Sequence, residues 1–237
     1  MDHDANSLSL PVGFRALVIG SSGGIGAAFV QCLQSNPRCA QVLGLHRHSS
    51  PAIDFDTEAS IAQAAAQLGS GRRFHLIIHA AGVLHTPQYM PEKKLSELNY
   101  AQLMDTFRTN TFGPALVLRH FTPLLDSQRG VMAVLSAKVG SIGDNRLGGW
   151  YSYRASKAAL NMLVKTASIE VKRSNPAAVL VALHPGTVHS RLSQPFRGSG
   201  TARSAADATS DMLLVLERLT PADTGQFFAY NGESLPW

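Results

Sequence analysis

The chain has 237 residues, of which 45% are hydrophobic, 7% aromatic and 16% charged. This composition is that of a globular protein with one sizeable core, and it excludes a disordered or fibrous chain. The formal net charge of +5 arises from basic residues scattered among acidic ones, which argues against a nucleic-acid or membrane partner.

The first third of the chain alternates between strand-like and helix-like patterns. The expected elements are a strand at 14–20, a glycine-rich turn and helix ending near Pro37, strands at 41–46 and 52–55, a helix at 57–68 with Thr57 as its N-cap, and a strand at 74–79.

The same alternation continues to the end of the chain. The expected elements are a long helical stretch at 96–125, a strand at 131–136, a glycine-rich loop, a helix at 151–173, and strands at 179–184 and 226–230. The strands are continuous apolar runs, which is typical of a parallel sheet buried on both faces. We therefore predict an α/β fold, a doubly wound parallel sheet of about seven strands with helices on both faces.

The predicted organisation is a tail at 1–12 and a single domain at 13–237, in which the irregular segment 186–206 forms a lid over a site. No secretory signal and no apolar run of bilayer length is visible, so we expect a soluble, cytoplasmic protein. Cys32 and Cys39 are too few for a disulfide framework and lack metal-site spacing. We expect no metal site.

A glycine cluster lies between the first strand and the first helix. In a doubly wound fold, this turn presents backbone N–H groups and a helix N-terminus to a pyrophosphate, and glycine permits the close backbone approach. The cluster, Gly20-Ser21-Ser22-Gly23-Gly24-Ile25-Gly26, has the spacing GxxxGxG. Ordinary strand-to-helix turns also use glycine, so the cluster alone does not decide the ligand.

The end of the second strand indicates which dinucleotide binds. An NAD-binding fold offers a carboxylate here to the ribose 2′-hydroxyl, but the sequence has His46-Arg47-His48. The guanidinium of Arg47 favours a 2′-phosphate and therefore NADP(H) over NAD(H). Asp54 is a candidate partner for the adenine amino group, with a turn or capping carboxylate as the alternative.

Two tyrosines precede one lysine in the segment WYSYRASK. Side chains four residues apart share a helix face, so Tyr153 is beside Lys157, whereas Tyr151 is paired with Ala155. A phenol has a pKa near 10, and an adjacent ammonium lowers the pKa by favouring the phenolate. Tyr153 is therefore a candidate proton donor and acceptor for a carbonyl or alcohol.

Asn110 precedes Pro114 by four residues in the long helical stretch. Proline has no N–H, so the carbonyl of Asn110 loses its partner and a continuing helix should bend here. Asn110 could then hold a water that extends a proton path from Lys157. The alternative is a helix that ends near Thr111.

Together these motifs resemble the short-chain dehydrogenase/reductase family of single-domain Rossmann-fold oxidoreductases. The resemblance runs from about Phe14 to Tyr230, and it includes His79-Ala80-Ala81-Gly82, similar to the family's NNAG turn, and Pro185-Gly186, similar to its PG motif. It implies a catalytic role for Asn110, Tyr153 and Lys157. The expected cofactor contacts are Gly20, Ser22, Gly24, Ile25, Gly26, Arg47, Asp54, Phe55, Ala81, Gly82, Tyr153, Lys157, Pro185, Gly186 and Val188.

The sequence departs from the family at the catalytic serine. The family usually carries two serines after the fifth strand and uses the second, but here Ser136 fills the first position and Ala137 the second. Ser136 is the candidate fourth catalytic residue and Ser141 its substitute. Loss of the hydroxyl at position 137 would cost about 2.7–4 kcal/mol of transition-state stabilisation if nothing replaces it.

Segments such as SAKVGSIGDN and GQFFAYNGESLPW are most similar to the subgroup that contains the bacterial C-factor and the insect sniffer carbonyl reductase. The resemblance implies an NADP(H)-dependent carbonyl reductase or alcohol dehydrogenase, acting on a small molecule as a homodimer or homotetramer. Substrate contacts are expected from Trp150, Tyr151, Leu192 and Phe196, although the first two could instead pack against a neighbouring subunit. The alternative function is a dinucleotide-binding signalling protein with vestigial catalysis.

Overall fold

The structure is a computed structural model that describes residues 10–71, 73–190, 192–196 and 202–237. Its centre is one parallel sheet with the strand order β2-β1-β3-β4-β5-β6. The strands are β1 (Phe14–Ile19), β2 (Cys39–Leu45), β3 (Leu76–His79), β4 (Val131–Leu135), β5 (Val179–His184) and β6 (Phe227–Ala229). The predicted doubly wound α/β fold is confirmed.

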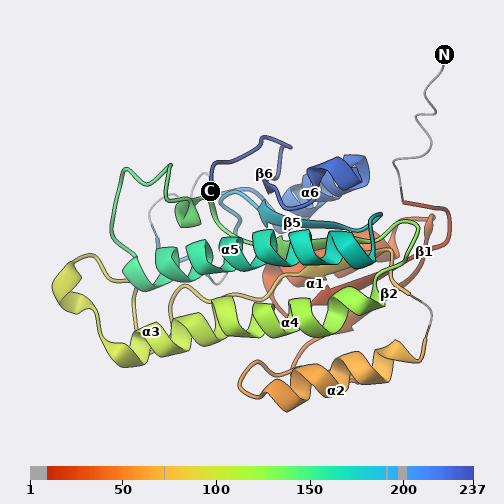
Figure 1. The fold of residues 1–237 in the computed structure, drawn as a ribbon. Coiled ribbons are helices and arrows are strands. Elements are labelled where there is room, and N and C mark those ends of the chain that lie inside the picture. Colours follow the sequence, from red (N-terminus) through yellow and green to blue (C-terminus); the bar gives the residue numbers. More distant parts are fainter. Residues whose placement is uncertain (1–9, 72, 191, 197–201) are drawn as a thin grey trace.

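Helices cover both faces of the sheet (Figure 1). They are α1 (Gly24–Gln34), α2 (Glu58–Gly69), α3 (Tyr100–Phe107), a π-helical segment (Arg108–Phe112), α4 (Gly113–Phe121), α5 (Tyr151–Ser174) and α6 (Ala205–Arg218). Short 3₁₀ turns occur at Leu95–Glu97, Thr122–Leu124, Lys138–Gly140 and Pro221–Asp223. Helices α1 and α6 pack together on one face, and α2, α4 and α5 on the other.

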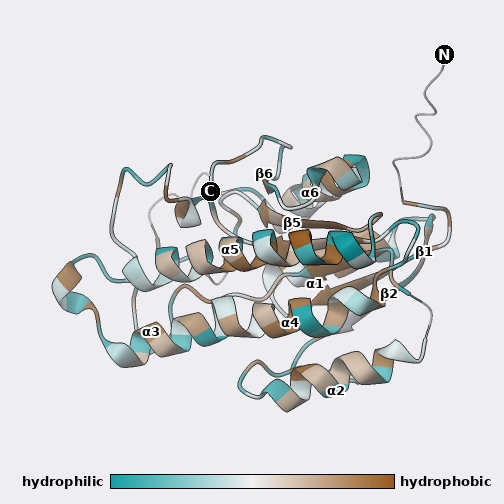
Figure 2. Ribbon diagram, in the orientation of Figure 1, coloured by the Kyte–Doolittle hydropathy of each residue, from teal (hydrophilic) through white to brown (hydrophobic). Residues whose placement is uncertain are grey.

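Two apolar cores follow from this layering. Alternate strand residues such as Val18 and Ile78 face α1 and α6, whereas Leu17 and Ile77 face α2, α4 and α5. Because successive strand side chains point to opposite faces, each apolar run supplies both cores. Figure 2 shows the result, with mostly hydrophobic strands lying between helices that carry both hydrophobic and hydrophilic residues.

Three details differ from the sequence-based expectation. The segment 52–55 forms no strand and pairs with no strand of the sheet, so the described sheet has six strands where about seven were expected. The predicted helical stretch 96–125 is divided by the π-helical segment. Helix α6 was not anticipated, although Ala208, Met212 and Leu216 recur every four residues and are fully buried.

The predicted tail and lid are described only in part. Residues 1–9 lie outside the described residues, and Leu10 is buried in the core. Residues 191 and 197–201 of the predicted lid also lie outside them. The described ends of the lid are joined, because His189 N donates to Arg203 O over 2.9 Å and Arg203 N donates to Thr187 O over 2.9 Å.

The order of the strands fixes where a ligand can bind. The chain passes from β1 to β2 on one side and then to β3 on the other side of β1. Such a reversal opens a crevice at the carboxyl ends of the two strands, which is the usual ligand site of an open α/β sheet.

Candidate active site

Three adjoining cavities form a groove along the carboxyl ends of the strands. The switch-point cavity (340 Å³) lies over β1 and β3, the middle cavity (550 Å³) continues from it, and the apolar cavity (210 Å³) ends the groove between β4 and β5. The first two share Ser22, Gly23, Ala80 and Gly82. The last two share Ile25, Leu84, Ser190 and Leu192.

Glycines bring the backbone close together at the switch-point cavity. A Cβ atom added to Gly20, whose φ is +88°, would lie 2.6 Å from Ala81 N, and one added to Gly26 would lie 2.2 Å from Gly20 O. Neither position has room for a side chain. By contrast, a Cβ added to Gly24 would meet only Ser190 Cβ, at an ordinary 3.7 Å.

Helix α1 begins in this groove without a cap. Its N-cap residue, Gly23, offers no side-chain hydrogen bond, and its first turn has no acidic residue. The first N–H groups of a helix carry a partial positive charge and lack intrahelical partners, so this end is suited to an anion such as a pyrophosphate.

The predicted nucleotide-binding residues meet at the other end of the switch-point cavity. Arg47 and Asp54 both line it, and Arg47 is exposed with no ion pair among the described residues. One oxygen of the Asp54 carboxylate accepts a 3.1 Å hydrogen bond from Asp56 N, which is the turn alternative, yet Asp54 still faces the cavity. Phe55 also lines the cavity and packs on His79 with a centroid distance of 5.4 Å.

Asn110 lies inside the π-helical segment and is fully buried. Its Oδ1 accepts from Val83 N and its Nδ2 donates to Val83 O, both over 2.8 Å, and Nδ2 also donates to Ser156 Oγ over 3.1 Å. The expected irregularity before Pro114 is present, as a π-helical turn within a continuing helix, and the alternative of a helix that ends near Thr111 is wrong. Asn110 therefore joins the loop after β3 to α5.

Tyr153 and Lys157 lie one turn apart on α5, as their spacing predicts. Tyr153 is 8% exposed and lines the apolar cavity, and its hydroxyl has no hydrogen-bond partner among the described residues. Lys157 Nζ donates to Leu135 O over 3.0 Å and lies 5.9 Å from the centroid of the Tyr153 ring. A Cβ at Gly82 would lie 3.5 Å from Lys157 Nζ and 3.4 Å from Asn110 Oδ1, so the three predicted residues share one site.

Burial sets the protonation of this pair. It lowers the pKa of Lys157 to about 8. It raises the pKa of the Tyr153 phenol above its ordinary value, which is opposite to the direction expected from the lysine alone. The desolvation of the phenolate outweighs the attraction of the ammonium, so Tyr153 holds its proton at neutral pH.

Neither candidate serine presents a free hydroxyl to the groove. Ser136 lines the apolar cavity, but its Oγ donates to Asn161 Oδ1 over 2.6 Å. Ser141 Oγ donates to Trp237 O over 3.2 Å and accepts from Asp144 N over 3.1 Å. Both hydroxyls are thus engaged within the protein, the expectation that one of them orients a substrate stays a prediction, and Ala137 itself packs on Tyr153 in the cavity wall.

Aromatic rings form the remaining wall of the apolar cavity. Trp150 adopts a left-handed φ of 53°, and its ring centroid lies 6.2 Å from that of Tyr153 and 5.1 Å from that of Phe196. Leu192 also lines the cavity, as expected, whereas Tyr151 does not. Pro185, Gly186 and Val188 complete the wall beside them.

The backbone of Trp150 is fixed by a buried carboxylate-bearing residue. Trp150 N donates to Glu92 O, and the side chain of Glu92 accepts hydrogen bonds from Ser152 N and Ser152 Oγ. Glu92 therefore caps the start of α5 and holds Trp150 in a conformation that is uncommon for a residue with a side chain.

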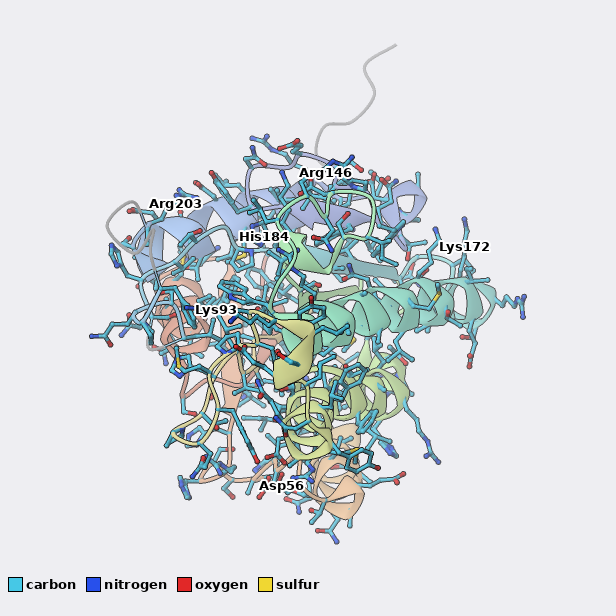
Figure 3. All side chains as sticks on the ribbon, turned by 90° about the vertical axis from the view of Figure 1, so that its left-hand side faces the viewer. Asp56, Lys93, Arg146, Lys172, His184 and Arg203 are labelled. Atoms are coloured by element: carbon cyan, nitrogen blue, oxygen red, sulfur yellow. The ribbon has the colours of Figure 1, made fainter. Side chains whose placement is uncertain are left out.

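His184 is a site residue that the sequence analysis did not identify. It lies at the carboxyl end of β5 and lines the apolar cavity. Figure 3 shows it near the middle of the view, whereas Asp56 and Lys172 lie near the periphery. The feature of the sequence that could have identified His184 is its position directly before Pro185-Gly186.

Within the residue ranges that the structure describes, features outside the groove add no second candidate. A further cavity of 710 Å³ lies along α4 and α5, and its lining includes none of the predicted site residues. Among the described residues, no group of three His, Cys, Asp or Glu side chains could hold a metal ion. No helix in the described part of the chain is long and apolar enough to cross a bilayer.

Comparisons with known proteins agree with this geometry. The chain is 30% identical over 188 residues to 1-hydroxy-2-glutathionyl-2-methyl-3-butene dehydrogenase of Rhodococcus, covering 79% of each protein. It is 36% identical over 146 residues to the C-signal of Myxococcus xanthus, covering 60% of this chain and 83% of that protein. This match supports the expected C-factor-like subgroup.

A solved structure shares the whole fold. NADPH-bound carbonyl reductase from chicken fatty liver superposes with a TM-score of 0.84 at 25% identity, covering 97% of this chain and 96% of that one. The family model for short chain dehydrogenases matches residues 50–199. The chain therefore belongs to the short-chain dehydrogenase/reductase family of oxidoreductases.

Proposed function

We propose that the protein is an NADP(H)-dependent oxidoreductase that transfers a hydride between nicotinamide and a carbonyl or alcohol substrate. The observation that carries the proposal is the unpartnered Tyr153 hydroxyl in the small apolar cavity, which adjoins the middle cavity of the groove. A proton donor in this cavity would meet a substrate there beside a nicotinamide that enters from the groove. The relatives named above include a dehydrogenase and a carbonyl reductase.

The groove has the chemistry that a dinucleotide phosphate requires. The uncapped start of α1 would hold the pyrophosphate, and the exposed guanidinium of Arg47 would hold the 2′-phosphate. Asp54 keeps one carboxylate oxygen for the adenine amino group. The nicotinamide, which supplies the hydride when bound, would lie beside Pro185, Gly186 and Val188.

Tyr153 and Lys157 on α5 would carry out the proton transfer, together with Asn110. As hydride adds to the carbonyl carbon, the carbonyl oxygen gains negative charge, and Tyr153 would give it a proton. Tyr153 is protonated at neutral pH, as the reduction direction requires. Lys157, close to the tyrosine ring, would stabilise the phenolate that remains, and Asn110 would lead replacement protons toward Lys157.

The test is NADPH oxidation by the purified protein over a panel of aldehydes, ketones and quinones, with NADH in parallel. Tyr153→Phe should reduce turnover at least about a hundredfold, the lower range for a lost general acid, while NADPH binding stays unchanged. Tyr151→Phe is the matched control, because Tyr151 lies outside the cavity lining, and it should retain activity. Full activity in Tyr153→Phe would contradict the proposed mechanism.

A second candidate function has its own support. The similarity to C-signal and the apolar Ala137 in the catalytic-serine position favour a dinucleotide-binding signalling protein with vestigial catalysis. This candidate predicts tight NADPH binding, no turnover across the panel, and no effect of Tyr153→Phe. Turnover that depends on Tyr153 would exclude it.

A further inference from the structure

The position at which the family usually supplies a second hydrogen-bond donor to the carbonyl oxygen has no hydroxyl in this chain. Ala137 occupies the expected position, and the hydroxyls of Ser136 and Ser141 are turned to Asn161 and Trp237. Two other serines of the wall, Ser190 and Ser193, share a hydrogen bond between their hydroxyls, and the Ser193 hydroxyl also donates to the backbone carbonyls of Val188 and Ser190. A donor for the substrate must come from another side chain.

His184 lies next to Ala137, the position that lacks the hydroxyl. Leu183 pairs with Leu135 across β5 and β4, and Ser136 N donates to Leu183 O over 2.9 Å. This register sets His184 beside the Ser136–Ala137 step. His184, Ala137 and Tyr153 all line the same 210 Å³ cavity, so one small molecule in it can contact all three. The imidazole lies near the middle of the view in Figure 3.

The imidazole has unused hydrogen-bonding capacity. Its Nδ1 is buried and has no partner among the described residues, whereas Nε2 is not buried and has no partner among them either. Nε2 is therefore the nitrogen that a molecule in the cavity can reach. Burial, with a further contribution from the charge of Lys138, lowers the pKa of His184 to about 4. The ring is therefore neutral at pH 7, with one N–H donor and one acceptor nitrogen. With its proton on Nε2, the ring can donate a hydrogen bond to a substrate without adding a charge to the cavity.

We infer that His184 hydrogen-bonds the substrate's carbonyl oxygen and replaces the serine hydroxyl absent at position 137. This inference rests on the proposed function. In the reduction, hydride from the reduced nicotinamide forms the new C–H bond, the C=O π bond breaks, and Tyr153 supplies the proton of the new O–H bond. The N–H of His184 stays on the ring and stabilises the oxygen while its negative charge develops.

The test compares His184→Leu, His184→Gln, Ala137→Ser and the double variant A137S/H184L in the NADPH oxidation assay. His184→Leu should lower kcat/KM by about a hundredfold, the range for loss of one donor to a developing oxyanion, with NADPH affinity unchanged. His184→Gln keeps an N–H donor and should retain most activity. Ala137→Ser should restore at least about tenfold of the activity lost in His184→Leu, since it returns a hydroxyl to the cavity.

The rescue separates a substrate contact from a structural role. His120→Leu is the matched control, because His120 is another partly buried histidine with an unpartnered nitrogen among the described residues but lines none of the three cavities of the groove, and it should change kcat/KM by less than about threefold. An active wild type whose kcat/KM is unchanged in His184→Leu, or a double variant that binds NADPH but gains nothing from the serine, overturns the inference alone. A wild type that turns over no carbonyl overturns the proposed function, and this inference with it.

Discussion

The two ends of the groove are built from different parts of the chain. The switch-point cavity is made largely of backbone, with Gly20, Gly26 and the start of α1 in fixed positions around the end of β1. The apolar cavity is made of side chains from loops, such as Trp150 and Phe196. On the proposed function, the backbone end holds the pyrophosphate that all such dinucleotides share, whereas the side-chain end decides which substrate fits and how it is polarised.

The largest effect is expected at the backbone end. In Gly26→Ala the new Cβ would lie 2.2 Å from Gly20 O and 2.8 Å from Gly20 C, and backbone atoms cannot move aside cheaply. The free energy of unfolding should fall by about 3 kcal/mol, as for severe overpacking. Chemical denaturation measures it. Gly24→Ala is the control, because its Cβ meets ordinary contacts only; an equal loss there would contradict the steric explanation.

The same contrast explains what the sequence could predict. The glycine turn, the strands and the Tyr153–Lys157 pair follow from local spacing, and the structure has them where the pattern indicates. The donor in the apolar cavity does not, because the direction of the Ser136 hydroxyl depends on Asn161, 25 residues away. The nearness of His184 likewise depends on the register of β4 and β5. Local patterns contain neither fact.

Two errors in the predicted secondary structure have their own reasons. The segment 52–55 resembles a strand, but an extended run becomes one only where a partner strand offers a ladder, and none does. Helix α6 begins within the last two residues of the predicted lid, and its four-residue apolar repeat lies just beyond the lid, in a stretch to which no element was assigned. Long, strongly periodic segments such as α5 were identified within a residue or two.

Two buried histidines should make stability depend on pH. Burial and the charge of Lys157 lower the pKa of His79 to about 3, and the pKa of His184 is lowered to about 4. Below about pH 6.5 the unfolded chain therefore binds protons that the folded chain does not, and stability falls as the pH falls. From pH 7 to pH 5 each histidine should cost about 2 kcal/mol.

Denaturation at several pH values tests this expectation. His79→Asn should remove about half of the loss attributed to the pair, since one of the two titrating groups is gone. Gln128→Asn, at an exposed position without a titrating group, should leave the pH dependence unchanged. If His79→Asn left the pH profile intact, the neutral buried imidazole would not be its source.

Arg47 tests whether the backbone end distinguishes the two dinucleotides. Arg47→Leu removes the guanidinium proposed for the 2′-phosphate, so the affinity for NADPH should fall about tenfold, equivalent to about 1.4 kcal/mol, while that for NADH stays the same. Titration of protein fluorescence gives both constants. Arg173→Leu, an exposed arginine on the last turn of α5, should alter neither. An equal loss of affinity for NADH would show that Arg47 maintains the shape of the cavity and does not bind the 2′-phosphate.

The smallest effect is expected at Ser136, and it bears directly on the side-chain end. Ser136→Ala removes the hydrogen bond to Asn161, so the free energy of unfolding should fall by about 1 kcal/mol. Turnover should stay within about twofold, because on our inference the imidazole of His184 polarises the substrate and the serine hydroxyl does not. Ser127→Ala, at an exposed position, is the control for stability. A loss of turnover with unchanged stability would instead mean that the Ser136 hydroxyl turns from Asn161 to the substrate. Ser136 would then take the role that the family usually gives to a serine at position 137.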